Sequence, residues 1–458
     1  MSPSVALLAL LQRVADSLDG ARPLTPRSTP ARLREALARV DFSRPMPPTD
    51  VIDALGALLR EHTLHAAHPR HMGLFHPPPH DVAVAAEALA AGVDAQLAVW
   101  GAAPGAVEVE RHTLAWVAAR FGYATHHGSF TSGASMSHHV AMSLALSTAI
   151  PGFARDGLVG CPARPMVYVS REGHGSVEKA ARLCGLGDAS VRRVRCDPAW
   201  RVDLRALREA IAEDRAAGRQ PAMVVATAGT TNTGAIDPLG ALADLCARED
   251  LWLHVDAAWA GAAALSPRTV SLLDGVARGD SIAWDAHKWL PLPIASGVLL
   301  TRHPARCAAL FAVDAPYVPR GDAERAMPYR ETALWSRRFT GLGLFALLAT
   351  LGAEGVARWV DEGCARGDAL RAAVTDAGWS LVAPVPLPLA CFTHERVRRG
   401  AVAPQRVAAA LRRGGVAWMS ETWLDGRIPA LHASVMHPGL TETDLAALTQ
   451  ALRALAAA

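Results

Sequence analysis

Short β-rich runs alternate with helical stretches through the centre of the chain. The runs are rich in Val, Leu, Ile and Ala, and helical patterns near 203–217 and 238–249 separate several of them. This alternation is typical of a mostly parallel sheet, because parallel neighbours need a crossover connection that is usually a helix. The sequence therefore predicts an α/β fold with helices on both faces of the sheet. The predicted strands are 166–170, 191–196, 223–227, 251–255, 281–284 and 297–301.

Polar residues stand at the ends of three predicted strands. Thr227 closes one run, Asp256 follows the next, and Asp285 follows the run after that. In open α/β sheets, ligands bind beyond the carboxyl ends of the strands. The sequence therefore predicts a ligand site where these three side chains lie.

One carboxylate and one lysine near this edge indicate a cofactor. Asp256 follows an apolar run and precedes two alanines, and Lys288 lies between His287 and Trp289. Each residue by itself has an ordinary interpretation, Asp256 as a surface aspartate after a strand and Lys288 as a solvated lysine. Taken together, they fit pyridoxal 5'-phosphate (PLP), since a lysine amine forms an imine with the cofactor aldehyde and a carboxylate keeps the pyridine nitrogen protonated.

Three neighbouring segments support a cofactor site, although each has an ordinary explanation. The Ser/Gly-rich segment 128–135 precedes a helix predicted from about Ser137, so it is either an N-cap or a phosphate-binding turn. His174 follows a strand and starts a helix, and it is either a cap or a ring that stacks on a flat cofactor. The segment 226–234 is either a hydroxyl-rich turn or a source of hydrogen-bond donors at the same edge.

The pattern divides the chain into three parts. Residues 1–75 form helices separated by proline-rich breaks, with little core of their own, so we expect them to pack on another domain or subunit. Residues 76–335 form the large cofactor-binding α/β domain. Residues 336–458 predict a long helix, short strands and a closing helix, which is a smaller α+β domain. The irregular segment 313–332 contains Tyr317 and is typical of a mobile lid.

Composition narrows the classes of partner. The net charge of +3 is small for 458 residues and the arginines are scattered, so we expect no nucleic-acid partner. Seven cysteines without a Cys-x-x-Cys pair favour free thiols and a cytoplasmic location. The apolar run 5–11 has no basic residue before it, unlike a secretory signal. No run approaches the ~18–20 apolar residues of a membrane span, so we expect a soluble protein.

A histidine series near residue 70 is the competing signal for a metal. Steps of three place several of these residues on one helix face, but Pro69 interrupts the helix and no acidic or thiol partner recurs at ligand spacing. We therefore expect no metal site. The series is His62, His65, His68, His71, His76 and His80.

These motifs together resemble those of the group II PLP-dependent decarboxylases, which include aromatic L-amino acid, histidine, glutamate and cysteine sulfinate decarboxylases. The resemblance covers nearly the whole chain, and its most specific parts are 254–261 and 287–289. It implies the type I fold of PLP-dependent transferases. The other matching segments are 68–75, 100–104, 108–110, 170–178, 226–231 and 335–339.

The resemblance also implies roles for individual residues. Lys288 would form the imine with the cofactor, Asp256 would pair with the pyridine nitrogen, and His174 would lie over the ring. The loop residue Tyr317 would protonate the substrate α-carbon, with Tyr329 as a second choice. In this family the loop and the Trp100 region reach into the partner's site, which implies a homodimer with shared active sites. The other implied cofactor contacts are Ala134, Ser135, Thr231, Ala258, Asp285 and His287.

We therefore expect decarboxylation of an L-amino acid to its amine and CO2. Leu74, Phe75 and Trp100 are expected walls of the substrate pocket, and the absence of an evident arginine for an acidic side chain favours an aromatic or bulky apolar substrate. An aldehyde-forming oxidative deaminase, a transaminase and an inactive binding protein are alternatives. Some positions depart from common family members, namely Met136, His138, Asp285, Ala286 and His432.

Overall fold

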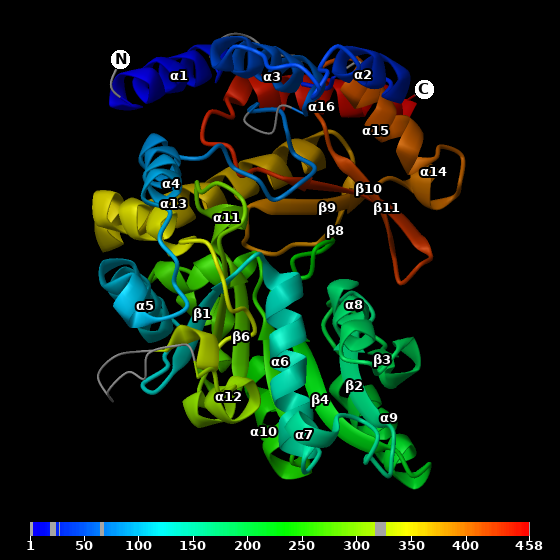
Figure 1. Ribbon diagram of the computed structural model, residues 1–458. Coiled ribbons are helices and arrows are strands. Elements are labelled where there is room, and N and C mark those ends of the chain that lie inside the picture. Colours follow the sequence, from blue (N-terminus) through cyan, green and yellow to red (C-terminus); the bar gives the residue numbers. More distant parts are fainter. Residues whose placement is uncertain (1–2, 19–23, 27, 65–67, 317–326, 458) are drawn as a thin grey trace.

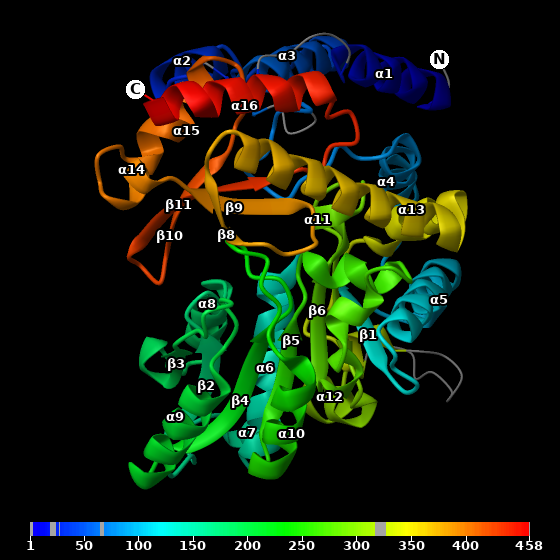
Figure 2. The same cartoon turned by 180° about the vertical axis from the view of Figure 1, so that it is seen from behind.

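The computed structural model describes residues 3–18, 24–26, 28–64, 68–316 and 327–457. A seven-stranded sheet forms the large domain, and a four-stranded sheet lies in the smaller C-terminal domain. Figures 1 and 2 show the C-terminal sheet and its helices at one end of the large domain, with the N-terminal helices at that same end. The predicted α/β fold and the smaller α+β part are confirmed.

The large sheet has the order β1-β7-β6-β5-β4-β2-β3. The strands β2 to β6 run parallel in this sheet, whereas β7 is antiparallel to both β6 and β1. The sheet is therefore mostly parallel, as predicted, with one reversed strand near its edge. Its strands are β1 (His127–Thr131), β2 (Pro165–Ser170), β3 (Val191–Val194), β4 (Gln220–Thr227), β5 (Trp252–Asp256), β6 (Ser281–Asp285) and β7 (Gly297–Thr301).

The central strands are apolar throughout because both faces of the sheet are covered. In β2, Met166 and Tyr168 pack into the core on one face, and Val167 and Val169 pack into the core on the other. This alternation follows from the two-residue period of a strand. Helices α5 (Pro104–Arg120), α9 (Leu204–Ala216) and α10 (Leu239–Glu249) contribute to the first core, and α6 (Ala134–Ala149), α8 (Ser176–Leu183) and α12 (Pro304–Phe311) contribute to the second. The expected helices on both faces are therefore present.

The helices of the large domain join successive strands or cover the sheet. The predicted patterns at 203–217 and 238–249 correspond to α9 and α10. The helices are α4 (Asp81–Val93), α5 (Pro104–Arg120), α6 (Ala134–Ala149), α7 (Phe153–Asp156), α8 (Ser176–Leu183), α9 (Leu204–Ala216), α10 (Leu239–Glu249), α11 (Ala286–Trp289) and α12 (Pro304–Phe311), with short 3-10 turns at Trp100–Ala102, Asp188–Ser190, Ala260–Leu265, Val270–Leu273, Val276–Arg278 and Pro328–Arg330.

The structure adds one strand that the sequence pattern did not predict. The segment 128–135 was interpreted only as a turn, but β1 occupies its first half and α6 begins at Ala134 rather than near Ser137. The sequence His-Gly-Ser-Phe-Thr of β1 lacks the apolar run that identifies a buried strand. The segment forms a strand because it pairs with the apolar strand β7, a tertiary contact that the local sequence does not reveal.

The C-terminal domain starts with a long helix, as predicted. This helix, α13 (Gly341–Asp376), has a kink at Gly352, whose φ is 63°. The domain's antiparallel sheet has the order β10-β11-β9-β8. Its elements are β8 (Ser380–Ala383), β9 (Leu389–Thr393), α14 (Glu395–Arg398), α15 (Pro404–Arg413), β10 (Ser420–Leu424), β11 (Ile428–Ser434) and α16 (Glu442–Ala457).

Helix α13 is the one described helix that is long and apolar enough to cross a membrane. It packs against α4, α5, α16 and β9 within the protein. These are the contacts of a helix that joins the two domains.

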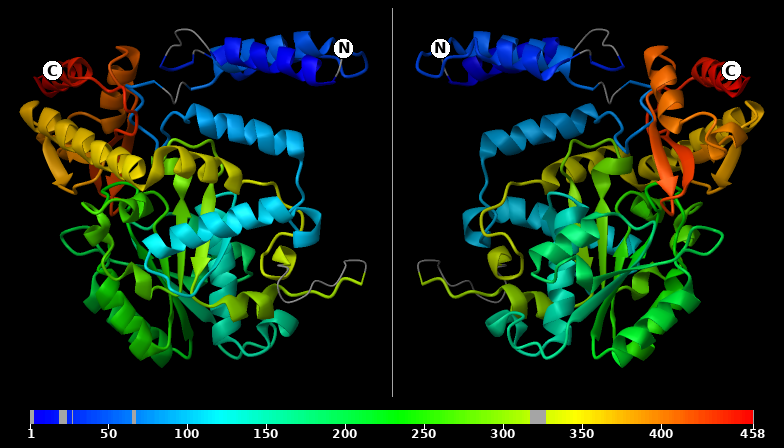
Figure 3. Two further views of the ribbon diagram at one scale, coloured as in Figure 1. Left: turned by 90° about the vertical axis from the view of Figure 1, so that its left-hand side faces the viewer. Right: turned by 90° about the vertical axis from the view of Figure 1, so that its right-hand side faces the viewer.

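Three N-terminal helices contrast with the rest of the molecule. They are α1 (Pro3–Leu18), α2 (Pro30–Leu37) and α3 (Pro48–His62). No described residue in them is buried. Figure 3 shows them as a layer that projects past α4 at one end of the molecule.

Candidate active site

A cavity of about 480 Å³ opens at the carboxyl ends of the parallel strands. Thr227, Asp256 and Asp285 reach it from the ends of β4, β5 and β6, as the sequence predicted. The cavity is also lined by nearly all the predicted cofactor and substrate residues of the described chain, namely Leu74, Phe75, Ala134, Ser135, His174, Thr231, Ala258, His287 and Lys288. The structure therefore gathers the separate motifs of the sequence at one place.

Asp256 is a buried carboxylate with two partners. Its Oδ1 accepts a hydrogen bond from the Ala258 N–H at 3.1 Å, and its Oδ2 lies 3.5 Å from His138 Nε2. Burial alone would raise the pKa of Asp256, but His138, Lys288 and the Ala258 N–H together hold that pKa below its ordinary value. The carboxylate is therefore ionised at neutral pH.

Polar contacts through His138 and Ser176 link Asp256 to His174. The Ser176 N–H donates to His174 Nδ1 at 3.2 Å, and Ser176 Oγ lies 2.7 Å from the same nitrogen. Because His174 Nδ1 is an acceptor, Ser176 Oγ donates its proton there and accepts one from His138 Nδ1, 2.9 Å away. On its other side, His138 presents Nε2 to Asp256 Oδ2 at 3.5 Å, which is ion-pair distance.

Two histidines near Asp256 are neutral. Burial lowers the pKa of His174. Because its Nδ1 accepts hydrogen bonds, its one proton lies on Nε2 at the cavity. His254 meets the His138 ring edge to face, with ring centroids 5.2 Å apart. Burial lowers the pKa of His254 to about 3.

Lys288 lines the same cavity. It stands in the short helix α11, and its Nζ is 3.0 Å from Asp285 Oδ2. The adjacent His287 accepts a hydrogen bond on Nδ1 from the Ser296 N–H at 3.1 Å, so its Nε2 carries the proton and remains free to donate. Figures 1 and 2 show α11 at the end of β6 that lies toward the C-terminal domain. Lys288 lines the cavity from this end of β6.

The first turn of α6 supplies a site for an anion. Ala134 and Ser135 line the cavity at the N-terminus of this 16-residue helix, where backbone N–H groups have no acceptor within the helix. Gly133 precedes the helix with a φ of 141°. A Cβ at Gly297 of β7 would lie 2.6 Å from the Gly133 backbone, so this turn requires glycine on both sides. The phosphate-binding interpretation of the turn fits this geometry.

Aromatic side chains form one wall of the cavity. The Phe75 ring stacks on Trp259 with centroids 4.5 Å apart, and it meets the His432 ring edge on at 5.5 Å. Leu74 and Ile294 also line the cavity and are 49% and 62% exposed. This wall is apolar.

Three predicted residues lie elsewhere. Trp100 does not line this cavity within one described chain, and its Nε1 donates to Glu108 Oε1 at 2.9 Å. Tyr329 is buried against Trp335, with ring centroids 4.3 Å apart, and it does not line the cavity either. Tyr317 lies outside the described residues. The contribution of Trp100 to a partner's site remains a prediction.

Sequence reasoning missed several residues of the cavity. Ser176 and Trp259 stand two and three positions after His174 and Asp256, so the flanking motifs contained them. His138 was noted as a departure from the family pattern, without its link to Asp256.

Among the described residues, no group of three or more His, Cys, Asp or Glu side chains has the arrangement of a metal site.

The cavity fits PLP by its own chemistry. Thr227 Oγ1 and Asp285 Oδ1 are buried without a hydrogen-bond partner in the part of the chain that the structure describes. Three features face this cavity. They are a helix N-terminus suited to a phosphate, an ionised carboxylate suited to a protonated ring nitrogen, and a lysine amine suited to an aldehyde. A flat ligand with one anionic end satisfies all three features.

Comparisons with known proteins agree with this geometry. Residues 33–395 match the pyridoxal-dependent decarboxylase conserved domain. The chain is 30% identical to the aromatic-L-amino-acid decarboxylase of Bacillus atrophaeus over 76% of this chain and 72% of the relative. It is 32% identical to the L-2,4-diaminobutyrate decarboxylase of Rhizobium meliloti (strain 1021) over 92% and 86%.

A solved structure extends the agreement to the whole fold. The tryptophan decarboxylase of Oryza sativa, solved with PLP and tryptamine, superposes with a TM-score of 0.87 at 26% identity. The match covers 99% of this chain and 96% of that one. The large and C-terminal domains thus have the type I fold of PLP-dependent enzymes. This chain belongs to the pyridoxal-dependent decarboxylase family and is a PLP-dependent amino acid decarboxylase.

Proposed function

We propose that the protein decarboxylates an L-amino acid with an aromatic or bulky apolar side chain to the corresponding amine. The observation that carries this proposal is the single cavity in which Lys288 and the ionised Asp256 meet the apolar wall of Phe75 and Trp259. The relatives act by name on an aromatic amino acid and on 2,4-diaminobutyrate, so family membership alone leaves the substrate open.

Each residue of the cavity has a proposed task. PLP, when bound, supplies an aldehyde for amino groups and a protonated ring that accepts electrons from the bond that breaks. Lys288 Nζ would hold the cofactor through its aldehyde. Asp256 would keep the ring nitrogen protonated, and His174 would cover the ring. Tyr317 would be the proton donor to the substrate α-carbon.

The remaining polar residues hold the cofactor in position. The N–H groups of Ala134 and Ser135 and the Nε2–H of His287 would be the donors for its phosphate end. Thr231 and Ala258 would lie around the ring, and Asp285 pairs with Lys288 in the cofactor-free protein. Together they fix the cofactor so that its reactive carbon meets the substrate.

The lining of the cavity supports the choice of substrate. An acidic side chain is normally bound by arginine, but no arginine of the described residues lines this cavity. The Phe75–Trp259 pair offers a flat apolar surface instead, and such aromatic pairs contribute about 0.5–1.5 kcal/mol beyond area burial. Replacing Phe75 with alanine should raise KM for an aromatic substrate by about two- to tenfold.

We also propose that the protein acts as a homodimer with shared active sites. The N-terminal helices expose apolar residues that a monomer leaves in water, such as Leu8 at 68% and Leu59 at 59%. A second copy of the chain would cover these residues, and C2 dimers are the commonest assemblies of soluble proteins.

One experiment tests the proposed reaction. The PLP-loaded protein is incubated with each of the twenty amino acids while CO2, hydrogen peroxide and ammonia are measured. We expect CO2 from an aromatic or bulky apolar substrate, without peroxide. Equimolar peroxide and ammonia would replace this proposal with the aldehyde-forming reaction, and CO2 from an acidic or basic substrate would overturn the substrate class.

A further inference from the structure

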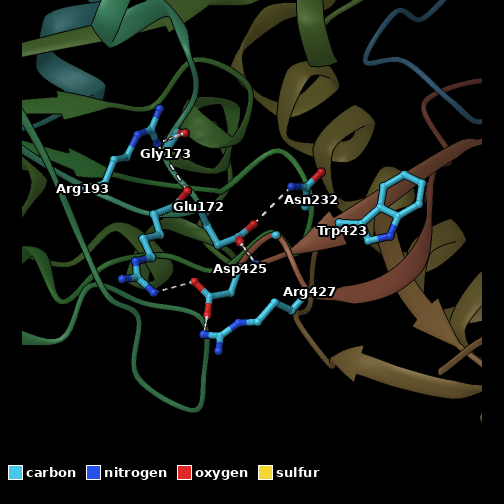
Figure 4. Close-up of a pocket in the computed structure, with 9 residues that line it drawn as sticks. Glu172, Gly173, Arg193, Asn232, Trp423, Asp425 and Arg427 are labelled. Carbon is cyan, nitrogen blue, oxygen red and sulfur yellow. Dashed lines mark hydrogen bonds and ion pairs between the residues drawn. The ribbon is translucent and has the colours of Figure 1, made fainter. Parts of the chain in front are cut away.

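A second cavity, of about 690 Å³, lies where the large domain meets the C-terminal hairpin. Figure 4 shows its lining, which includes Glu172, Asn232 and the turn residue Asp425. Glu172 stands two positions before His174, and Asn232 directly follows Thr231. The two segments that bring His174 and Thr231 to the cofactor cavity therefore also border this second cavity.

Glu172 connects three segments that are distant in the sequence. It is only 7% exposed. Its Oε1 accepts a hydrogen bond from the Asp425 N–H at 2.8 Å, and its Oε2 accepts one from Asn232 Nδ2 at 3.1 Å. Both carboxylate oxygens are thus used, one toward the C-terminal domain and one toward the segment after β4 (Figure 4).

The hairpin turn presents its N–H group in a fixed direction. Asp425 and Gly426 follow β10 with φ values of 49° and 67°, and β11 starts two residues later. Two successive residues with positive φ form the tight turn that matches the twist of paired strands, and Asp-Gly is a favoured sequence for it. The Asp425 N–H is therefore held by the backbone geometry of the turn.

Other contacts hold the two segments against the same framework. Arg193 of β3 donates to the carbonyls of Ser170 and Gly173, on either side of Glu172. His432 of β11 lies with its Nδ1 3.3 Å from the Asn232 carbonyl. Burial lowers the pKa of His432 to about 4, so the ring is neutral and its Nδ1–H donates. The C-terminal domain thus contacts Asn232 at both its side chain and its backbone.

We propose that Glu172 is a positioning residue that clamps the C-terminal hairpin to the two segments carrying His174 and Thr231. The clamp fixes the positions of His174 and Thr231 at the cofactor cavity, because its hydrogen bonds connect their segments to a turn of the C-terminal domain. This inference rests on the proposed function for the roles of His174 and Thr231, but the clamp itself is a property of the protein without any substrate.

Four variants separate the clamp from the surrounding ion pairs. Glu172→Ala removes both acceptors. Glu172→Gln keeps an acceptor for the Asp425 N–H, and its new N–H₂ group is accommodated when the Asn232 amide turns its oxygen inward. Asp425→Asn keeps the turn and the backbone N–H but removes the pairs with Arg171 and Arg427. Asn232→Ala deletes one contact only, and it serves if Glu172→Ala does not fold.

Amide hydrogen exchange of the cofactor-free protein measures the clamp directly. In Glu172→Ala we expect exchange about ten- to a hundredfold faster at the hairpin turn and at 170–176 and 228–234, since hydrogen bonds to a charged group are lost. Asn232→Ala should show a smaller increase at 228–234. Glu172→Gln and Asp425→Asn should stay within about threefold of the parent protein, and exchange in β5 and β6 should not change in any variant.

Enzyme kinetics supply the second readout. In Glu172→Ala, kcat should fall about tenfold while KM changes little, and Glu172→Gln should restore most of it. Unchanged exchange at all three segments would overturn the clamp, as would equal loosening in Asp425→Asn, which would assign the contact to the arginine pairs. Faster exchange without any change in kcat would overturn only the positioning role. If no amino acid is decarboxylated, the proposed reaction fails while the exchange result still decides the clamp.

Discussion

The cofactor cavity and the N-terminal helices differ in how their residues are enclosed. At the cavity, β4, β5 and β6 are buried along nearly their whole length, and their last residues meet at one edge. The helices α1 and α3 pack on each other but expose apolar residues such as Leu8 and Leu59. One chain thus encloses the framework of the cavity, whereas the helices leave apolar residues exposed. The two regions should therefore fail in different ways when they are altered.

The largest effect is expected at the cavity. The chain contains two lysines, Lys288 in the cavity and Lys179 on the exposed side of α8. Lys288→Ala should abolish turnover because the amine that binds the cofactor is lost. The matched control Lys179→Ala should keep the parent rate in an assay of CO2 release. Full activity in Lys288→Ala would contradict the site assignment.

Changes in the N-terminal helices should instead weaken dimer formation. The double variant Leu8→Glu with Leu59→Glu puts charges on the most exposed apolar positions of α1 and α3. We expect the dimer dissociation constant to rise by at least about a hundredfold in sedimentation equilibrium, because burying these charges is unfavourable. Arg39→Glu, an exposed position outside these helices, should leave the mass unchanged. A monomeric parent protein, or a double variant that dimerises normally, would contradict the dimer proposal.

The link between His138 and Asp256 predicts an intermediate effect. His138→Leu removes one of the groups that hold the pKa of Asp256 below its ordinary value, so that pKa should rise. Because the ionised carboxylate is required, turnover should then fail at a higher pH as the solution is acidified. We expect the acid limb of the kcat profile to move up by about one pH unit, with a loss of about tenfold at its foot.

The matched variant for this prediction is His138→Gln, whose amide keeps an N–H near Asp256. It should shift the acid limb less than His138→Leu does. Identical profiles for both variants and the parent protein would show that His138 does not control Asp256.

A pH dependence of folding separates the two regions again. Burial lowers the folded-state pKa of His254 to about 3 and of His432 to about 4, from an ordinary value of 6.5. The unfolded chain therefore binds protons first as the pH falls below about 6.5, and the free energy of unfolding decreases down to the folded pKa values. The loss is up to about 1.4 kcal/mol per pH unit for each histidine.

Urea unfolding between pH 7 and pH 4 measures this loss. His432→Phe should flatten the dependence, because one titrating group is removed. The same measurement on a variant of the N-terminal helices, such as Leu8→Glu, should retain the parent slope. A slope that is unchanged in His432→Phe would contradict the assignment of a neutral buried histidine.

Much of the cavity could be predicted because its residues follow recognisable runs. Asp256 and Asp285 each stand at the end of an apolar strand, and the two-residue period of a buried sheet places such ends at one edge. Strand β1 could not be predicted, since its polar sequence forms a strand only beside β7. The domain boundaries at 75 and 335 remain predictions.

The contacts between distant segments were also beyond the sequence pattern. His138 and Ser176 lie on α6 and α8, and their hydrogen bond depends on how those helices pack. Glu172 and Asp425 meet across two domains. Local sequence patterns do not predict such pairs, because side-chain hydrogen bonds between elements depend on tertiary packing.

The central claim is that residue 288 carries the cofactor. Borohydride reduction of the PLP-loaded protein, followed by proteolysis and mass spectrometry, fixes any imine as a stable adduct on the lysine that formed it. With two lysines in the chain, the result is unambiguous. We predict the reduced cofactor on the peptide containing Lys288, in proportion to the protein present. An adduct on Lys179 alone, or no adduct on a protein that binds PLP and decarboxylates an amino acid, would contradict this account.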